Sequence, residues 1–183
     1  MTEASGLADM LASRLRVLCG TDVEVTGLRQ LSGGASRESW DIRVRTAGAA
    51  ERRLILLRAA PGRAPEKDIA VEAAAMIAAR GAGVPAPELH DFGNGALGRD
   101  YLLMERLDGE TIPRRLLRDD AYAAVRPRLA RRLGQVLARI HQVDPEKIPG
   151  LPRGRARPAD RSLPGLRRAP ARAGDRPALA GRA

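Results

Sequence analysis

The stretch LSGGASRESW, residues 31–40, decides the fold that this sequence predicts. Gly33 and Gly34 stand at its centre, with Ser36 two positions further on. Positions 23–31 before it read as a strand. After it, apolar and charged residues alternate from 40 to 45, which is the pattern of a half-buried strand. A strand, a glycine turn and a second strand predict a β-hairpin.

The turn of this hairpin has two interpretations. Two adjacent glycines are most often only a turn. They also let the backbone approach a ligand closely, because glycine has no side chain, and backbone N–H groups in such a turn can cradle phosphate oxygens. The order of the residues that follow favours the second interpretation.

The rest of residues 1–150 shows further strand and helix patterns. We predict helices over 7–18, 69–81 and 127–141, and further strands over 53–58, 88–92 and 100–107. Gly81 is expected to end the second helix in the left-handed conformation. A five-stranded sheet with one helix between its third and fourth strands is an α+β arrangement.

Two charged residues follow the glycine turn in an order that suggests a phosphate site. Arg58 ends the third strand, and Glu72 lies on the helix that comes next. A cation at that strand end could pair with phosphates, and a carboxylate could hold the cation by an ion pair. Either residue alone is more often solvated. Together with the turn, they predict one nucleotide cleft.

Several segments resemble those of a known family, both in their residues and in their order along the chain. They are LSGGASRE at 31–38, LRAAP at 57–61, AGVPAPELHDFG at 82–93, LLMERLDGETIP at 102–113 and LARIHQVDPEKIPGLP at 137–152. The series is similar to the N-terminal lobe of the aminoglycoside phosphotransferase and choline kinase superfamily, which has the protein-kinase-like fold. Within this superfamily, the segments look like the subgroup of phosphotransferase domains attached to acyl-CoA dehydrogenases. The resemblance covers roughly residues 25–152.

The resemblance implies ATP as the cofactor and assigns its contacts. Gly33, Gly34 and Ser36 would cover the phosphates, Arg58 would replace the usual phosphate-binding lysine, and Glu72 would hold it. Residues Met104, Glu105, Arg106 and Leu107 would form the hinge, where the Glu105 carbonyl and the Leu107 amide would bond adenine. An arginine at the lysine position departs from the family pattern, since the two side chains are not interchangeable.

The residues that would carry out the chemistry in this family are missing from the sequence. Members take the catalytic base and the magnesium ligands from a His-Gly-Asp segment, a following Asn and a later Asp. No His-Gly-Asp occurs here. Asp91-Phe92-Gly93 spells the magnesium triplet of protein kinases but precedes the hinge, so we assign Asp91 to the fourth strand. No metal ligand is assigned.

These features predict a truncated, inactive ATP-dependent phosphotransferase for small-molecule hydroxyl groups. One alternative is a non-catalytic nucleotide-binding or regulatory module. Another is a nucleic-acid-binding protein that acts through its basic tail. We expect nucleotide as a partner, a small-molecule acceptor in the parent enzyme, and neither membrane nor nucleic acid.

The resemblance, together with the composition of the tail, divides the chain into four parts. They are an N-terminal helix over 1–20, a kinase-like lobe over 21–107, the hinge exit with the first helices of a second lobe over 108–150, and a tail over 151–183. Of the net charge of +10, the tail carries nine arginines against two aspartates. Its proline-rich composition predicts disorder, and a frameshift near residue 152 is one hypothesis for its origin. The tail has no aromatic residue on which bases could stack.

The cysteine content, the N-terminal sequence and the lengths of the apolar runs bear on the cellular location. Cys19 is the single cysteine, so no disulfide can form within the chain. We see neither a signal peptide at the N-terminus nor an apolar run long enough for a membrane span. A cytoplasmic location is therefore expected.

Overall fold

The computed structural model describes residues 3–31, 37–62 and 69–152. The predicted phosphate-covering residues Gly33, Gly34 and Ser36 lie outside these ranges, as does nearly all of the basic tail. The architecture below concerns the packed unit Met1–Leu151.

Five strands form one sheet in the order β1-β2-β3-β5-β4, and every neighbouring pair is antiparallel. The elements along the chain are α1 (Glu3–Cys19), β1 (Val23–Leu31), β2 (Arg37–Thr46), β3 (Arg52–Ala59), α2 (Ile69–Gly81), β4 (Leu89–Gly93), β5 (Tyr101–Glu105), α3 (Pro113–Arg118), η1 (Asp120–Tyr122), α4 (Arg126–His141) and η2 (Pro145–Lys147). With α2 inserted between β3 and β4, the predicted α+β class is confirmed.

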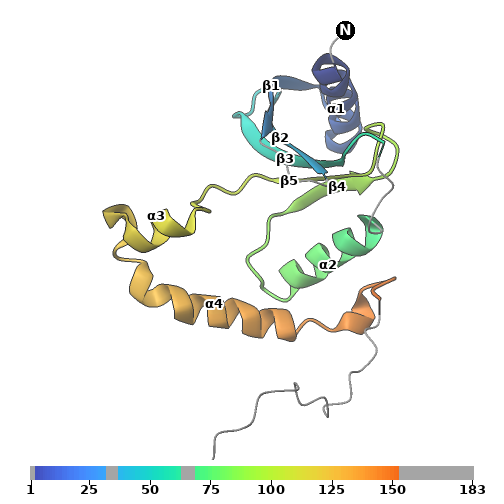
Figure 1. Ribbon diagram of the computed structural model, residues 1–183. Coiled ribbons are helices and arrows are strands. Elements are labelled where there is room, and N and C mark those ends of the chain that lie inside the picture. The colour runs from blue at the N-terminus through green and yellow to red at the C-terminus, as the bar shows by residue number, and fades with distance from the viewer. Residues whose placement is uncertain (1–2, 32–36, 63–68, 153–183) are drawn as a thin grey trace, which may run out of the picture. The chain divides into compact units, whose positions relative to one another are not determined.

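Helices α1 and α2 cover opposite faces of the sheet (Figure 1). On one face, α1 buries Leu7, Leu11 and Leu15 against side chains that include Trp40 and Leu56. This core forms because apolar residues on α1 recur at helical spacing while those on the strands alternate.

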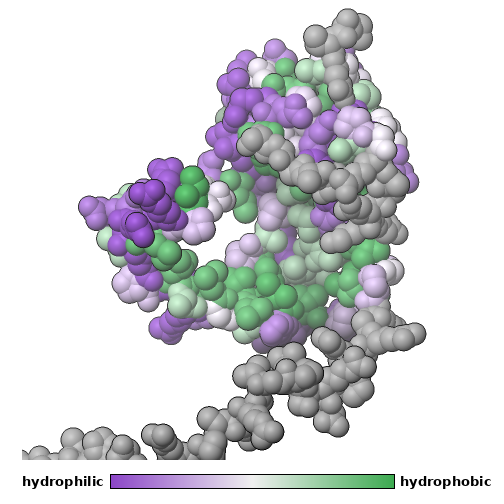
Figure 2. Space-filling view, viewed as in Figure 1, coloured by the Kyte–Doolittle hydropathy of each residue, from purple (hydrophilic) through white to green (hydrophobic). Residues whose placement is uncertain are grey.

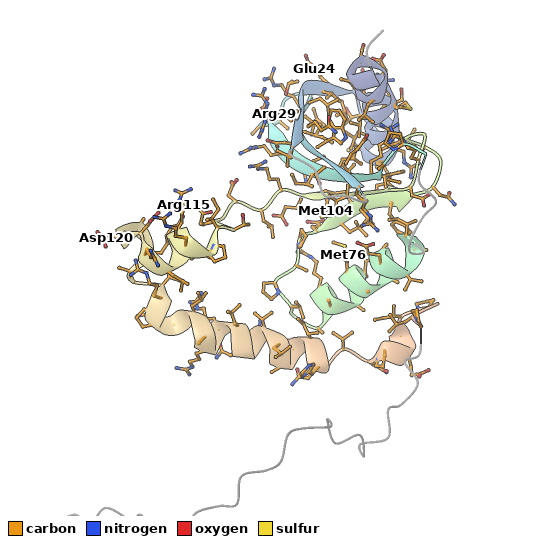
Figure 3. All side chains as sticks on the ribbon, in the orientation of Figure 1. Glu24, Arg29, Met76, Met104, Arg115 and Asp120 are labelled. Atoms are coloured by element: carbon orange, nitrogen blue, oxygen red, sulfur yellow. The ribbon has the colours of Figure 1, made fainter. Side chains whose placement is uncertain are left out.

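A smaller core joins α2 to the other face. It contains Ala73 from α2 with Leu102 and Met104 from β5, and Met76 packs against it. Met76 and Met104 lie between the helix and the sheet in Figure 3. Neighbouring residues of β5 therefore enter different cores, because successive side chains of a strand point to opposite faces.

The end of α2 differs from the prediction in one detail. The helix includes Gly81, and the positive backbone angle belongs to Gly83, whose φ is +77°. The chain leaves the helix two residues later than expected, since the amides of Ala82 and Gly83 still bond to carbonyls of the last turn.

Helix α4 is amphipathic, but within the described residues its apolar stripe is not covered. Leu133, Leu137 and Ile140 are all exposed, and Figure 2 shows hydrophobic residues gathered along this helix. The segment after α4 packs on α2: Ile148 is buried, and Gly150 lies so close that an added Cβ would be 2.8 Å from Val71 Cγ2. Among the described helices, none is long and apolar enough to span a bilayer.

Candidate functional site

The sheet places Arg58 and Glu72 on opposite faces, so the predicted pairing of these two residues is wrong. Arg58 shares a face of β3 with Leu54 and Leu56, which belong to the core beneath α1. Glu72 lies in the first turn of α2, which packs on the other face. Strand alternation forces this separation, since residues two apart in a strand point the same way.

Arg58 is buried in a polar network on the α1 face. Its Nε donates to the carbonyl oxygen of Leu97 at 3.1 Å, and its Nη1 lies 3.8 Å from Glu38 Oε2. Arg99 approaches the same carboxylate at 3.4 Å. Gly98, with φ of +77°, lets the loop pack on the guanidinium, because an added Cβ would lie 3.4 Å from Arg58 Nη2. Arg58 therefore ties the 97–99 loop to the sheet.

Glu72 is held by Arg37 instead. Arg37 Nη1 donates to Oε1 at 2.9 Å and Nη2 donates to Oε2 at 2.6 Å, so the pair is bidentate. Both side chains keep between a quarter and a third of their surface exposed, at 27% and 32%. The ion pair links the start of β2 to the first turn of α2 and remains open to solvent.

The predicted hinge residues lie at and just beyond the end of β5. Met104 is buried in the α2 core. The Glu105 amide donates to the carbonyl of Glu88 at 2.8 Å, and the amide of Arg106 donates to the carbonyl of Arg53 at 3.3 Å. Leu107 is exposed. The chain thus leaves the sheet at Arg106, beside β3, and the bonds predicted between this backbone and adenine stay predictions.

A cationic groove of about 470 Å³ opens on the sheet face opposite α1, beside this exit. Asp41 is one of the residues that line the groove, and its buried Oδ2 accepts hydrogen bonds from Arg29 and Arg53 at 3.1 Å each and lies 2.9 Å from Arg106 Nη1. Burial alone would raise the pKa of Asp41. The bonds to Arg53 and Arg29 and the charge of Arg106 outweigh burial and lower the pKa below its usual value.

Asp91, from the Asp-Phe-Gly triplet, is a structural residue of β4. Its carboxylate accepts two bonds from Arg14 of α1 and one from the Tyr101 hydroxyl of β5. Burial opposes ionisation, but these bonds prevail and lower the pKa of Asp91. Burial and the bond to Asp91 raise the pKa of Tyr101 to about 12. The prediction that Asp91 belongs to the fourth strand is confirmed.

Sequence reasoning missed Arg37 and Asp41. Arg37 stands one residue after Ser36, inside the stretch LSGGASRESW that predicts the hairpin. Only the register of the paired strands, which puts Arg37 opposite Ala59, shows which face it lies on, because residues directly opposite each other share a face. In the described part of the chain, no group of three or more metal-ligating side chains is placed to hold a metal ion.

A five-stranded antiparallel sheet with one inserted helix, followed by further helices, is consistent with the predicted N-terminal lobe of a protein-kinase-like fold. Residues 27–182 match the model of the phosphotransferase enzyme family, so the chain belongs to that family. The match also runs through most of the segment predicted to be a disordered tail.

No curated protein matches the chain. A solved structure of a candidate fructosamine-3-kinase from Thermobifida fusca is similar at 21% identity, with a TM-score of 0.41. The match covers 71% of this chain and 38% of that one, so the chain spans well under half the length of that protein.

Proposed function

We propose that this chain forms the nucleotide-binding part of an ATP-dependent phosphotransferase that acts on a hydroxyl group of a small molecule. The observation that carries the proposal is the match to the phosphotransferase enzyme family over residues 27–182. The strand order β1-β2-β3-β5-β4, with α2 on one face, is compatible with it.

Several residues on the face opposite α1 support this proposal. Leu57 offers an apolar, half-buried surface for a base, and the backbone beyond Glu105 leaves the sheet beside β3. Arg37 supplies a partly exposed cation at the opposite end of the same face. When bound, ATP would provide the phosphoryl group, while these residues would hold and orient it.

We assign no magnesium ligand to this chain and therefore no catalytic step that depends on magnesium. The described residues contain no metal-ligand cluster, and the sequence contains no His-Gly-Asp segment. The chain by itself should therefore bind ATP with little or no turnover. The same observation favours a second candidate function, which is a nucleotide-binding or regulatory module without catalysis.

Calorimetric titration of the full chain with ATP tests the binding proposal, and product analysis over a panel of small alcohols and sugars tests turnover. Saturable binding of ATP is expected, and its absence up to millimolar nucleotide contradicts the proposal. Binding without transfer to any acceptor supports the non-catalytic module. Transfer to an acceptor would contradict the expectation that this chain is inactive alone.

A further inference from the structure

We propose that Arg37, held by Glu72, is the residue that contacts the phosphates of the nucleotide, in place of the third-strand cation that such a site was expected to use. The inference rests on the proposed function, because it assigns a role within the same site. It begins from the register of β2 and β3, which fixes the face of the sheet on which each side chain at the start of β2 lies.

The register puts Arg37 opposite Ala59 and Glu38 opposite Arg58. Residues directly opposite each other in an antiparallel pair point to the same face. Glu38 and Arg58 therefore share the α1 face, while Arg37 and Ala59 share the α2 face. At the α2-facing end of β3, where a phosphate-binding cation was expected, Ala59 has no charge to offer.

Arg37 meets the physical requirements of that missing cation. Arg37 lies beside the Ser39–Leu57 pair on the same face of the sheet, and both residues of that pair are half-buried. A guanidinium has five N–H donors in one plane, so a single arginine can bind a carboxylate and a phosphate together. Its side chain is 27% exposed, which leaves it accessible to a ligand.

Glu72 acts as a positioning residue for this cation. The two bonds of 2.9 and 2.6 Å fix the plane of the guanidinium and remove much of its rotational freedom before any ligand arrives. Glu72 itself lies in the first turn of α2, where the helix dipole favours a carboxylate. Since α2 is anchored through Ala73 and Met104, the orientation of Arg37 depends on the smaller core.

The test compares nucleotides that differ only in their phosphates. Dissociation constants for ATP and adenosine are measured by calorimetry on the full chain, for the wild type, Arg37→Gln, Arg37→Lys and Glu72→Gln. Arg52→Gln is the matched control, because Arg52 is an exposed cation on the other face of the sheet and its loss changes the net charge equally.

We expect Arg37→Gln to weaken ATP binding about tenfold or more, the effect of losing a charge-assisted hydrogen bond, and to change adenosine binding less than about twofold. Arg37→Lys should keep part of the ATP affinity. Glu72→Gln should weaken ATP binding several-fold and leave adenosine binding unchanged. Arg52→Gln should bind both ligands like the wild type.

Two results overturn the inference while leaving the proposed function intact. In the first, Arg37→Gln binds ATP like the wild type. In the second, Arg37→Gln loses affinity for ATP and for adenosine equally, which would mean that the ion pair only supports α2. A wild type that does not bind ATP overturns both proposals together. Circular dichroism establishes folding, and if Arg37→Gln does not fold, Arg37→Lys and Glu72→Gln decide by the same ATP-to-adenosine ratio: an unchanged ratio in both rejects the role of Arg37.

Discussion

Arg14 of α1 and Asp91 of β4, 77 positions apart in the chain, form a bidentate ion pair with N–O distances of 2.7 and 2.8 Å. The Tyr101 hydroxyl donates to the same carboxylate at 2.5 Å. One carboxylate thus joins α1, β4 and β5 at the edge of the larger core. The triplet that spells a magnesium motif serves here to close the sheet against its first helix.

Replacing Asp91 by Asn should lower the free energy of unfolding by about 2–4 kcal/mol, because it leaves the Arg14 charge without its partner at a partly buried position. Urea unfolding measures this loss. Asp22→Asn is the control, since its ion pair with Arg16 is exposed and should contribute less than about 1 kcal/mol. Equal effects of the two substitutions would show that the network adds no more stability than an exposed pair.

The stability of the fold should decrease in acid. The folded-state pKa values of Asp91 and Asp41 are both lowered, so their contribution is fully present above the unfolded value of about 3.9 and is lost as the pH falls through the folded values. Burial, with the charge of Arg52, also lowers the pKa of His90, which adds an earlier decline below about pH 6.5. Urea unfolding between about pH 2.5 and 7 measures both steps. A stability that is constant below about pH 4 would contradict the assignment of the two carboxylates.

Strand positions were predictable, and side-chain direction at Arg58 was not. β1 begins and ends where the sequence predicted, because turn residues flank it. Residues 54–57 are all apolar, so β3 shows no alternation from which the facing of Arg58 could be read. Leu54 and Leu56 are buried beneath α1, while Ile55 and Leu57 are half-buried on the other face, and only this packing decides where Arg58 points.

Long-range ion pairs could not be predicted from the sequence either. Nothing in local sequence connects Arg14 to Asp91, since their contact exists only once α1 lies against the sheet edge. The partnership of Glu72 was predicted in kind, as a carboxylate holding a cation, but with the wrong arginine. Arg37 was the nearer candidate by register, and register is a property of the paired strands.

We expect Arg58 to have a structural role, and its replacement by Met tests this. Met keeps much of the length of the side chain and removes its charge. The loss of the bond to the Leu97 carbonyl and of the nearby charge for Glu38 should lower the free energy of unfolding by about 2–4 kcal/mol. The ratio of ATP to adenosine affinity should not change. A tenfold loss of ATP affinity with unchanged stability would restore Arg58 as the phosphate-binding residue.

The exposed stripe of α4 should cause the protein to self-associate. Leu133, Leu137 and Ile140 lie on one side of the helix and are each about half exposed or more, and uncovered apolar surface of this kind promotes association in water. Replacing Leu133 and Leu137 together by Lys should reduce the association seen by sedimentation at micromolar concentration. Lysine is a good helix former, so the helix itself should persist. Arg131→Lys and Arg132→Lys, which leave the stripe unchanged, serve as controls, and equal association in both double variants would mean that another surface is responsible.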